Sequence, residues 1–225
     1  MADLSRREFI GAVPAILLAS TRITRTDASP IRIALVYSPE YNAVQRAATM
    51  SAREVERAAG LLDRDFEFLA LVDTAGSTLD PAWSAIIVAT NRSLVLPAVP
   101  TVDVSGVLPC AANVLKLTPP AHTTLRVWHH RLERFGAAQL NDRFRAAGIA
   151  PDDQAWLGWF AVKLSWEAAV RGRSPAELRY DGHKGMPLRF NDAGVLLQPL
   201  YEVAGDQVVR EVKPDAAREQ VTCAS

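Results

Sequence analysis

The sequence predicts an α/β protein in which a parallel sheet carries helices and a smaller β-rich segment follows. Compact apolar runs alternate with a long helical pattern over residues 31–117, and the pattern changes to short strands and turns after residue 179. Hydrophobic residues make up 49% of the 225 positions, enough to bury a sizeable core. Strand–helix–strand order favours a parallel sheet, because a parallel connection needs a crossover.

The first half of the chain predicts one long helix among several strands. Residues 31–37 (IRIALVY) are rich in β-branched side chains and indicate a buried strand. Residues 43–62 place small and apolar side chains on one helical face. A short helix is expected at 79–83, because Asp80-Pro81 suits a helix start. The remaining apolar runs predict strands at 66–72, 85–89, 101–104 and 113–117.

The second half predicts helices and then strands. Residues 123–147 have a helical pattern that breaks at Gly136. Residues 152–170 give the clearest helix, with acidic side chains at its positive N-terminal end and apolar side chains around most of its circumference. Its tryptophans, Trp156, Trp159 and Trp166, are expected in the core. Three strands joined by hairpin turns are predicted at 186–190, 197–203 and 208–212.

The N-terminus predicts export. Arg6 and Arg7 precede Glu-Phe-Ile and an apolar run at residues 10–19, which matches a twin-arginine signal. That run is shorter than the roughly 20 residues of a membrane span, so the mature chain is not expected to span a membrane. The predicted organisation is therefore a signal at 1–28, an α/β lobe at 29–178, a β-rich segment at 179–212 and a tail at 213–225. The expected location is the periplasm.

Charge and motifs exclude several function classes. The chain carries 25 basic and 25 acidic residues, and no basic field for nucleic acid is present. Metal, nucleotide and hydrolase motifs such as HExxH, GxGxxG and GxSxG are absent from the sequence. We therefore predict no catalytic residue, no metal and no cofactor. Cys110 and Cys223 can form a disulfide in an oxidising compartment if geometry brings them together.

Two histidine-containing pairs have ordinary interpretations. His129 and His130 are adjacent, and neighbouring side chains on a helix point about 100° apart, so a solvated helix face is favoured over a metal site. His183 and Lys184 lie in a glycine-flanked turn, and a solvated hairpin entrance is the expectation there.

The polar loops after the strands are the candidate ligand site. In open α/β sheets, ligands bind outside the carboxyl ends of the strands. An ordinary structural loop is the alternative interpretation at each of these positions. The residues predicted to contact a ligand are Ser38, Tyr41, Thr74, Thr90 and Asn91.

Several blocks of the sequence resemble a known family. Residues 31–60 and 65–76 (DFEFLALVDTAG) are similar to the first two strands and first helix of type 1 periplasmic binding proteins, the branched-chain amino-acid receptor group. Residues 158–203 are similar to a late helix of that family, its F-D-G turn and its Q-P-x-Y strand. Within the group, residues 108–120 and 133–145 resemble the branch associated with pyrroloquinoline-quinone (PQQ)-dependent alcohol dehydrogenase systems.

The resemblance implies a Rossmann-like three-layer lobe and a non-enzymatic role as the substrate-binding component of an ABC transporter. The implied partners are a small-molecule ligand and either ABC transporter membrane subunits or a quinoprotein dehydrogenase. Family members are longer and have two lobes, whereas most of the second lobe is missing here, which leaves a reduced remnant. The alternative hypothesis is therefore a degenerate receptor lobe that acts as a protein-interaction module.

Overall fold

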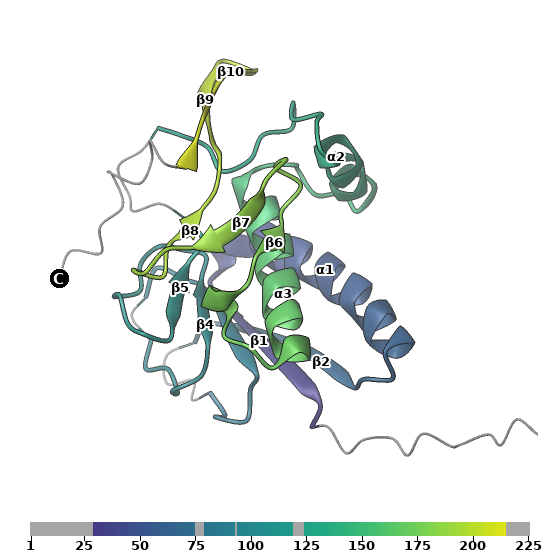
Figure 1. The fold of residues 1–225 in the computed structure, drawn as a ribbon, viewed down its shortest axis with the longest axis vertical. Coiled ribbons are helices and arrows are strands. Elements are labelled where there is room, and N and C mark those ends of the chain that lie inside the picture. The colour runs from purple at the N-terminus through teal and green to yellow at the C-terminus, as the bar shows by residue number, and fades with distance from the viewer. Residues whose placement is uncertain (1–28, 75–78, 93, 119–123, 215–225) are drawn as a thin grey trace, which may run out of the picture.

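The computed structural model describes residues 29–74, 79–92, 94–118 and 124–214 of the chain (Figure 1). Its central sheet is parallel, with the strand order β2-β1-β3-β4-β5. The strands are β1 (Ile31–Tyr37), β2 (Phe66–Val72), β3 (Ala85–Ala89), β4 (Thr101–Asp103) and β5 (Val114–Lys116). The predicted α/β fold class with a parallel, Rossmann-like sheet is confirmed.

The burial of each strand follows its place in the sheet. Strand β3 (AIIVA) is buried at every position, as its continuous apolar sequence allows when both faces of a parallel sheet are covered. Strand β2 lies at the edge, and its side chains are half-buried or exposed. Leu69 and Val72 of this edge strand are exposed apolar residues.

Two helices cover one face of the sheet. Helices α1 (Asn42–Leu61) and α3 (Asp153–Arg171) pack against each other and join Ile33 and Leu35 of β1 in the main core. The Asp152 side chain caps α3 by accepting the Ala155 N–H at 2.9 Å, as its position before the helix predicts.

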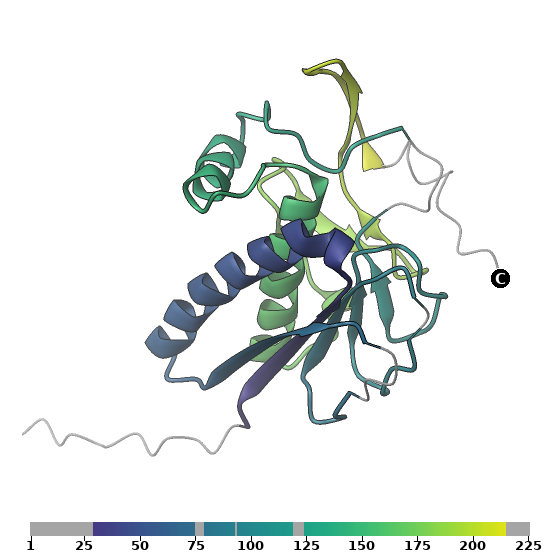
Figure 2. The ribbon, with the colours of Figure 1, turned by 180° about the vertical axis from the view of Figure 1, so that it is seen from behind.

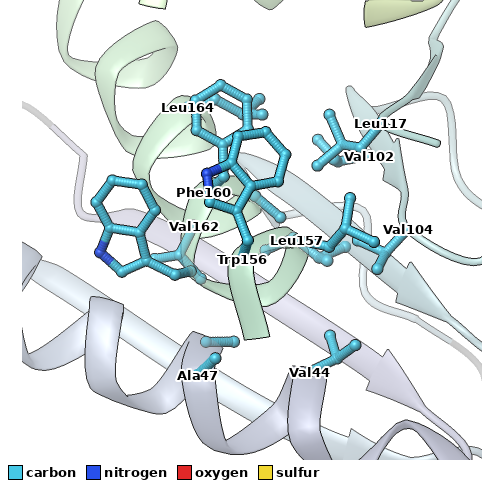
Figure 3. Close-up of a cluster of buried hydrophobic side chains, with 14 of the residues drawn as sticks. Val44, Ala47, Val102, Val104, Leu117, Trp156, Leu157, Phe160, Val162 and Leu164 are labelled. Atoms are coloured by element: carbon cyan, nitrogen blue, oxygen red, sulfur yellow. The ribbon is translucent and has the colours of Figure 1, made fainter. Parts of the chain in front are cut away.

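Side chains of α3 fill the space between α1 and the sheet. Figure 3 shows Trp156, Leu157 and Phe160 of α3 in one cluster with Val44 of α1 and with Val104, which follows β4. The predicted burial of Trp156, Trp159 and Trp166 is confirmed, since all three are buried. The amphipathic α1 and the largely apolar α3 therefore complete one layer of the fold.

The opposite face of the sheet is covered by loops. Ala34 and Val36 of β1 pack there against Trp83 and Leu108 in a second, smaller core cluster. The short helix expected at residues 79–83 does not form, and that prediction is wrong. The Asp80 carboxylate instead accepts the Ala82 N–H at 2.9 Å, which closes a local turn with the side chain that would have capped the helix.

The second half adds short elements. The predicted strand at 197–203 divides into two, because Pro199 has no N–H to give to a ladder. Two 3₁₀ turns, Pro39–Tyr41 and Pro175–Glu177, begin with proline. The remaining elements are α2 (Ala137–Ala146), β6 (Tyr180–Asp181), β7 (Pro187–Phe190), β8 (Leu196–Leu197), β9 (Leu200–Ala204) and β10 (Gln207–Val212).

Residues 124–136 do not form the first piece of helix that the sequence predicts. Phe135 and Gly136 have φ angles of 58° and 86°, in the left-handed region that a right-handed helix cannot contain. Arg126 forms an antiparallel bridge with Tyr201 of β9. The segment is therefore an irregular connection that is held by tertiary contacts.

The β9–β10 hairpin and α2 stand at the same end of the molecule, beyond the carboxyl ends of the sheet strands (Figures 1 and 2). Across the part of the chain that the structure describes, no helix combines the length and apolar character needed to cross a membrane.

Candidate ligand-binding site

The predicted ligand residues follow neighbouring strands of the sheet. Ser38 comes directly after β1, Thr74 lies just beyond β2, and Thr90 and Asn91 follow β3. The chain passes from β1 to β2 on one side and later to β3 on the other, so the strand order changes direction at β1. This is the topological switch point, where open α/β sheets leave a crevice between two loops.

A hydrogen-bonded bridge joins the two loops at the switch point. The Tyr41 hydroxyl donates to Asn91 Oδ1 at 2.9 Å, and Asn91 Nδ2 donates to Glu40 Oε1 at 2.8 Å. Burial raises the pKa of Tyr41, with a smaller contribution from the Glu40 carboxylate, so the phenol stays protonated and remains a donor. Tyr41 and Asn91 are thus brought together as predicted, and Glu40 is a partner that the sequence interpretation missed.

Ser38 is buried with its hydroxyl unused. Its backbone N–H donates to the Ala89 carbonyl oxygen at 3.0 Å, which fixes the residue between β1 and β3. The side chain is 8% exposed, and Oγ has no hydrogen-bond partner. The Ser38 hydroxyl is therefore a buried group with an unused donor and acceptor in the loop after β1.

Thr90 has a structural role within the site. Its hydroxyl donates to Asp73 Oδ2 at 2.6 Å and accepts the Arg92 N–H at 3.2 Å. Arg92 Nε also lies 4.0 Å from the same carboxylate oxygen. Asp73 was not among the five predicted ligand residues, although a carboxylate directly after the β2 strand is a signal that could have found it. Thr74, its neighbour, is exposed.

Two further predictions lie outside the described residues. Cys110 is in the loop between β4 and β5, but Cys223 is not described, so the proposed disulfide stays a prediction. The predicted signal at residues 1–28 is likewise outside the described part of the chain.

His129 and His130 form a cluster with Asp206 instead of a solvated helix face. His129 is buried, and His130 Nε2 lies 2.8 Å from Asp206 Oδ1 in the β9–β10 turn. Although the three side chains are near enough to share a metal ion, their bonding does not suit one. His129 Nδ1 already accepts the Arg131 N–H at 3.2 Å, and the Arg131 guanidinium holds Asp206 at 2.7 Å. The cluster therefore fastens the hairpin tip to residues 129–131.

Lys184 is buried, contrary to the expected solvated turn. Its ammonium donates to the Val127 carbonyl oxygen at 2.6 Å, to Gln198 Oε1 at 2.6 Å and to the Pro199 carbonyl oxygen at 3.2 Å. Nζ also lies 4.0 Å from the ring centroid of Trp156. Burial lowers the pKa of Lys184, while the three oxygens favour the charged form. Lys184 thus ties its own turn to two other segments, at Val127 and at Gln198-Pro199.

Comparison with known proteins found similarity to solved structures. No protein-family model and no curated protein matches the chain. A solute-binding protein of an ABC transporter from R. palustris, in complex with benzoate, is similar with a TM-score of 0.47 and 11% identity over 82% of this chain and 96% of that chain.

Two longer structures are also similar. An ABC transporter substrate-binding protein from Sphaerobacter thermophilus has a TM-score of 0.35 and 11% identity over 83% of this chain. The branched-chain amino acid transporter substrate-binding protein LivJ from Streptococcus pneumoniae, in complex with isoleucine, has a TM-score of 0.28 and 14% identity over 81% of this chain. The matches cover 61% and 60% of those two chains. At such scores, function has to be argued from the site itself.

Proposed function

We propose that this chain is a periplasmic solute-binding protein that binds a small molecule at the carboxyl ends of β1 and β3 without carrying out chemistry on it. The observation that carries the proposal is the unpartnered, buried Ser38 hydroxyl beside the Tyr41–Asn91 bridge. A solute with a hydroxyl, carboxylate or amide group would supply the missing hydrogen bond.

The arrangement around Ser38 suits binding better than catalysis. The Tyr41 phenol and the Asn91 amide are engaged with each other, and Thr90 is engaged with Asp73. No described residue near Ser38 is placed as a base for its hydroxyl, since Oγ has no hydrogen-bond partner. A rigid polar site of this kind selects and holds a ligand.

The sequence resemblance supplies the proposed context. It supports delivery of the solute to ABC transporter membrane subunits, within a system linked to PQQ-dependent alcohol oxidation. A quinoprotein dehydrogenase is the other proposed partner.

The test compares two serines that both carry an unpartnered buried hydroxyl, Ser38 and Ser165. Alcohols, carboxylic acids, amino acids and PQQ are screened by thermal shift against the mature chain, and the affinity of each hit is measured by calorimetry. We expect S38A to weaken binding of a strand-end ligand by about tenfold, the value of one lost hydrogen bond.

Ser165 lies in α3 and provides the matched control. S165A removes an equivalent hydroxyl away from the strand ends and should leave the affinity unchanged. A screen without any stabilising solute at millimolar concentration, or a screen in which no hit loses affinity in S38A, would refute the proposed function.

A further inference from the structure

A cavity of about 490 Å³ lies apart from the strand-end site. Side chains of the β9–β10 hairpin form one wall, and residues 131–137 form the other. Lys184 and Tyr201 contribute buried side chains to its lining. None of the five predicted ligand residues lines it. The volume falls within the range of small-molecule sites in proteins.

Tyr201 lines this cavity and has an unused side-chain hydroxyl. The residue is 4% exposed, and no described residue forms a hydrogen bond with its side chain, although its backbone is bonded to Arg126. Burial raises the pKa of Tyr201, and the Glu211 carboxylate adds to that effect. The phenol is therefore a protonated donor at neutral pH, which lacks an acceptor.

Lys184 contributes a buried amine to the cavity; burial lowers its pKa, while its three hydrogen-bond acceptors favour the protonated form. The residue is 3% exposed, and all three of its hydrogen-bond acceptors are neutral oxygens. Asp153 and Glu211 act on it through longer-range attraction, and neither forms a salt bridge with it. A buried charge that is not neutralised by contact favours an anion nearby, because the surroundings screen it weakly.

The other charged side chains differ in how they are paired. Arg131 is held by Asp206 at 2.7 Å, and Arg210 by Glu202 at 2.8 Å. Arg134 has no carboxylate partner among the described residues and lines the cavity. Two acidic residues, Glu133 and Glu211, also line the cavity, and both are exposed, as Arg134 is, whereas Lys184 is buried.

Phe135 provides an apolar surface at the same place. Its φ angle of 58° is unfavourable for a bulky residue, yet the side chain is 62% exposed. The ring lies directly against the backbone of Gly185, where any Cβ would clash with it. An aromatic ring that is held in a strained conformation and left open to solvent is suited to contact with a ligand.

We propose that this cavity binds a small carboxylate with an apolar body. Its carboxylate would accept hydrogen bonds from the Tyr201 hydroxyl and the Arg134 guanidinium, in the field of Lys184. Its apolar part would lie against Phe135 and Val208. The site is independent of the strand ends, so it stands whether or not a solute binds beside Ser38.

The test measures three probes of matched shape by calorimetry on the mature chain: phenylacetate, neutral phenylacetamide and cationic phenethylamine. We expect phenylacetate to bind at least about tenfold more tightly than either of the others. Y201F and R134Q should each weaken its binding by about tenfold. Because the Tyr201 hydroxyl has no partner, Y201F should keep the thermal midpoint of the parent chain.

Two controls identify the place of binding. R53Q removes an exposed arginine of α1 and should leave the affinity for phenylacetate unchanged. S38A should also leave it unchanged, because Ser38 belongs to the strand-end site. The proposal fails if phenylacetate does not bind, if the amide or amine binds equally well, or if S38A weakens binding while Y201F and R134Q do not.

Discussion

Asp103 and Ser38 are both buried polar residues at strand ends, but their side chains are used differently. Asp103 accepts the Gly106 N–H at 2.8 Å and the Leu108 N–H at 3.0 Å, so its carboxylate is occupied by the loop that follows β4. Ser38 Oγ has no such partner. A polar residue at a strand end is thus a ligand contact only if its own loop leaves it available.

His129 predicts a dependence of stability on pH. Burial lowers the pKa of His129, and the neighbouring His130 lowers it further. The unfolded chain therefore binds the proton more readily than the folded chain below the ordinary histidine pKa of about 6.5. The contribution of neutral His129 to the free energy of unfolding is fully present above that pH. It is lost as the pH falls toward the lower pKa of the folded state.

Urea denaturation of the mature chain between pH 7.5 and 5 measures this effect. We expect the free energy of unfolding to decrease on acidification, and to decrease less in H129N. The asparagine carbonyl can still accept the Arg131 N–H that His129 accepts at 3.2 Å. Parallel pH curves for the parent chain and H129N would show that His129 does not contribute.

Among the elements, the crossing of α1 and α3 depends on one glycine. A Cβ at Gly158 would clash with the carbonyl oxygen of Val44, and a backbone oxygen cannot rotate away. G158A should therefore destabilise the fold by about 1–3 kcal/mol, as overpacked cores do. Denaturant unfolding measures this change.

Gly60 is the matched control in the same pair of helices. It lies in α1, and a Cβ at this position would have no atom within 4 Å, so G60A should be neutral or stabilise by up to about 1 kcal/mol. Equal stability of G158A and the parent chain would mean that the helices can separate at no cost.

The elements that the sequence predicted correctly are those with a strong local pattern. Helix α3 combines a capping Asp152 with a nearly continuous apolar sequence, and β3 is apolar throughout. Segment 124–136 and Lys184 were predicted wrongly because distant contacts decide them. Lys184 is buried by Val127, 57 positions earlier, and no local pattern contains that information.

The candidate site, like the fold, was predicted from the sequence only in part. The sequence placed Ser38, Tyr41 and Asn91 at strand ends, and the switch point brings their loops together. Glu40 and Asp73 were not among the five predicted residues, and their hydrogen bonds to Asn91 and Thr90 depend on the loop conformation. The cavity beside Tyr201 needs both the hairpin and residues 131–137, which are separated in the sequence.

At the scale of the whole molecule, the proposed periplasmic location predicts that the chain is exported through its arginine pair. Replacing both Arg6 and Arg7 by lysine should keep the chain in the cytoplasm, since the arginine pair is the receptor-read part of the address. Fractionation with an antibody against the mature chain measures the distribution. Lysine replacement at Arg22 and Arg25 is the control, and normal export of the Arg6–Arg7 variant would contradict the predicted route.

The packing of α3 on α1 also determines when folding can be completed. Trp159 Nε1 donates to Glu54 Oε2 at 3.1 Å across 105 positions, and Arg46 donates to the Gly148 carbonyl oxygen at 2.7 Å across 102. A ribosome has therefore made about three quarters of the chain, through Arg171, before this face of the sheet can be covered. Such distant contacts give a high contact order, so slow, largely post-translational folding is expected, with the apolar face of α1 open to chaperones meanwhile.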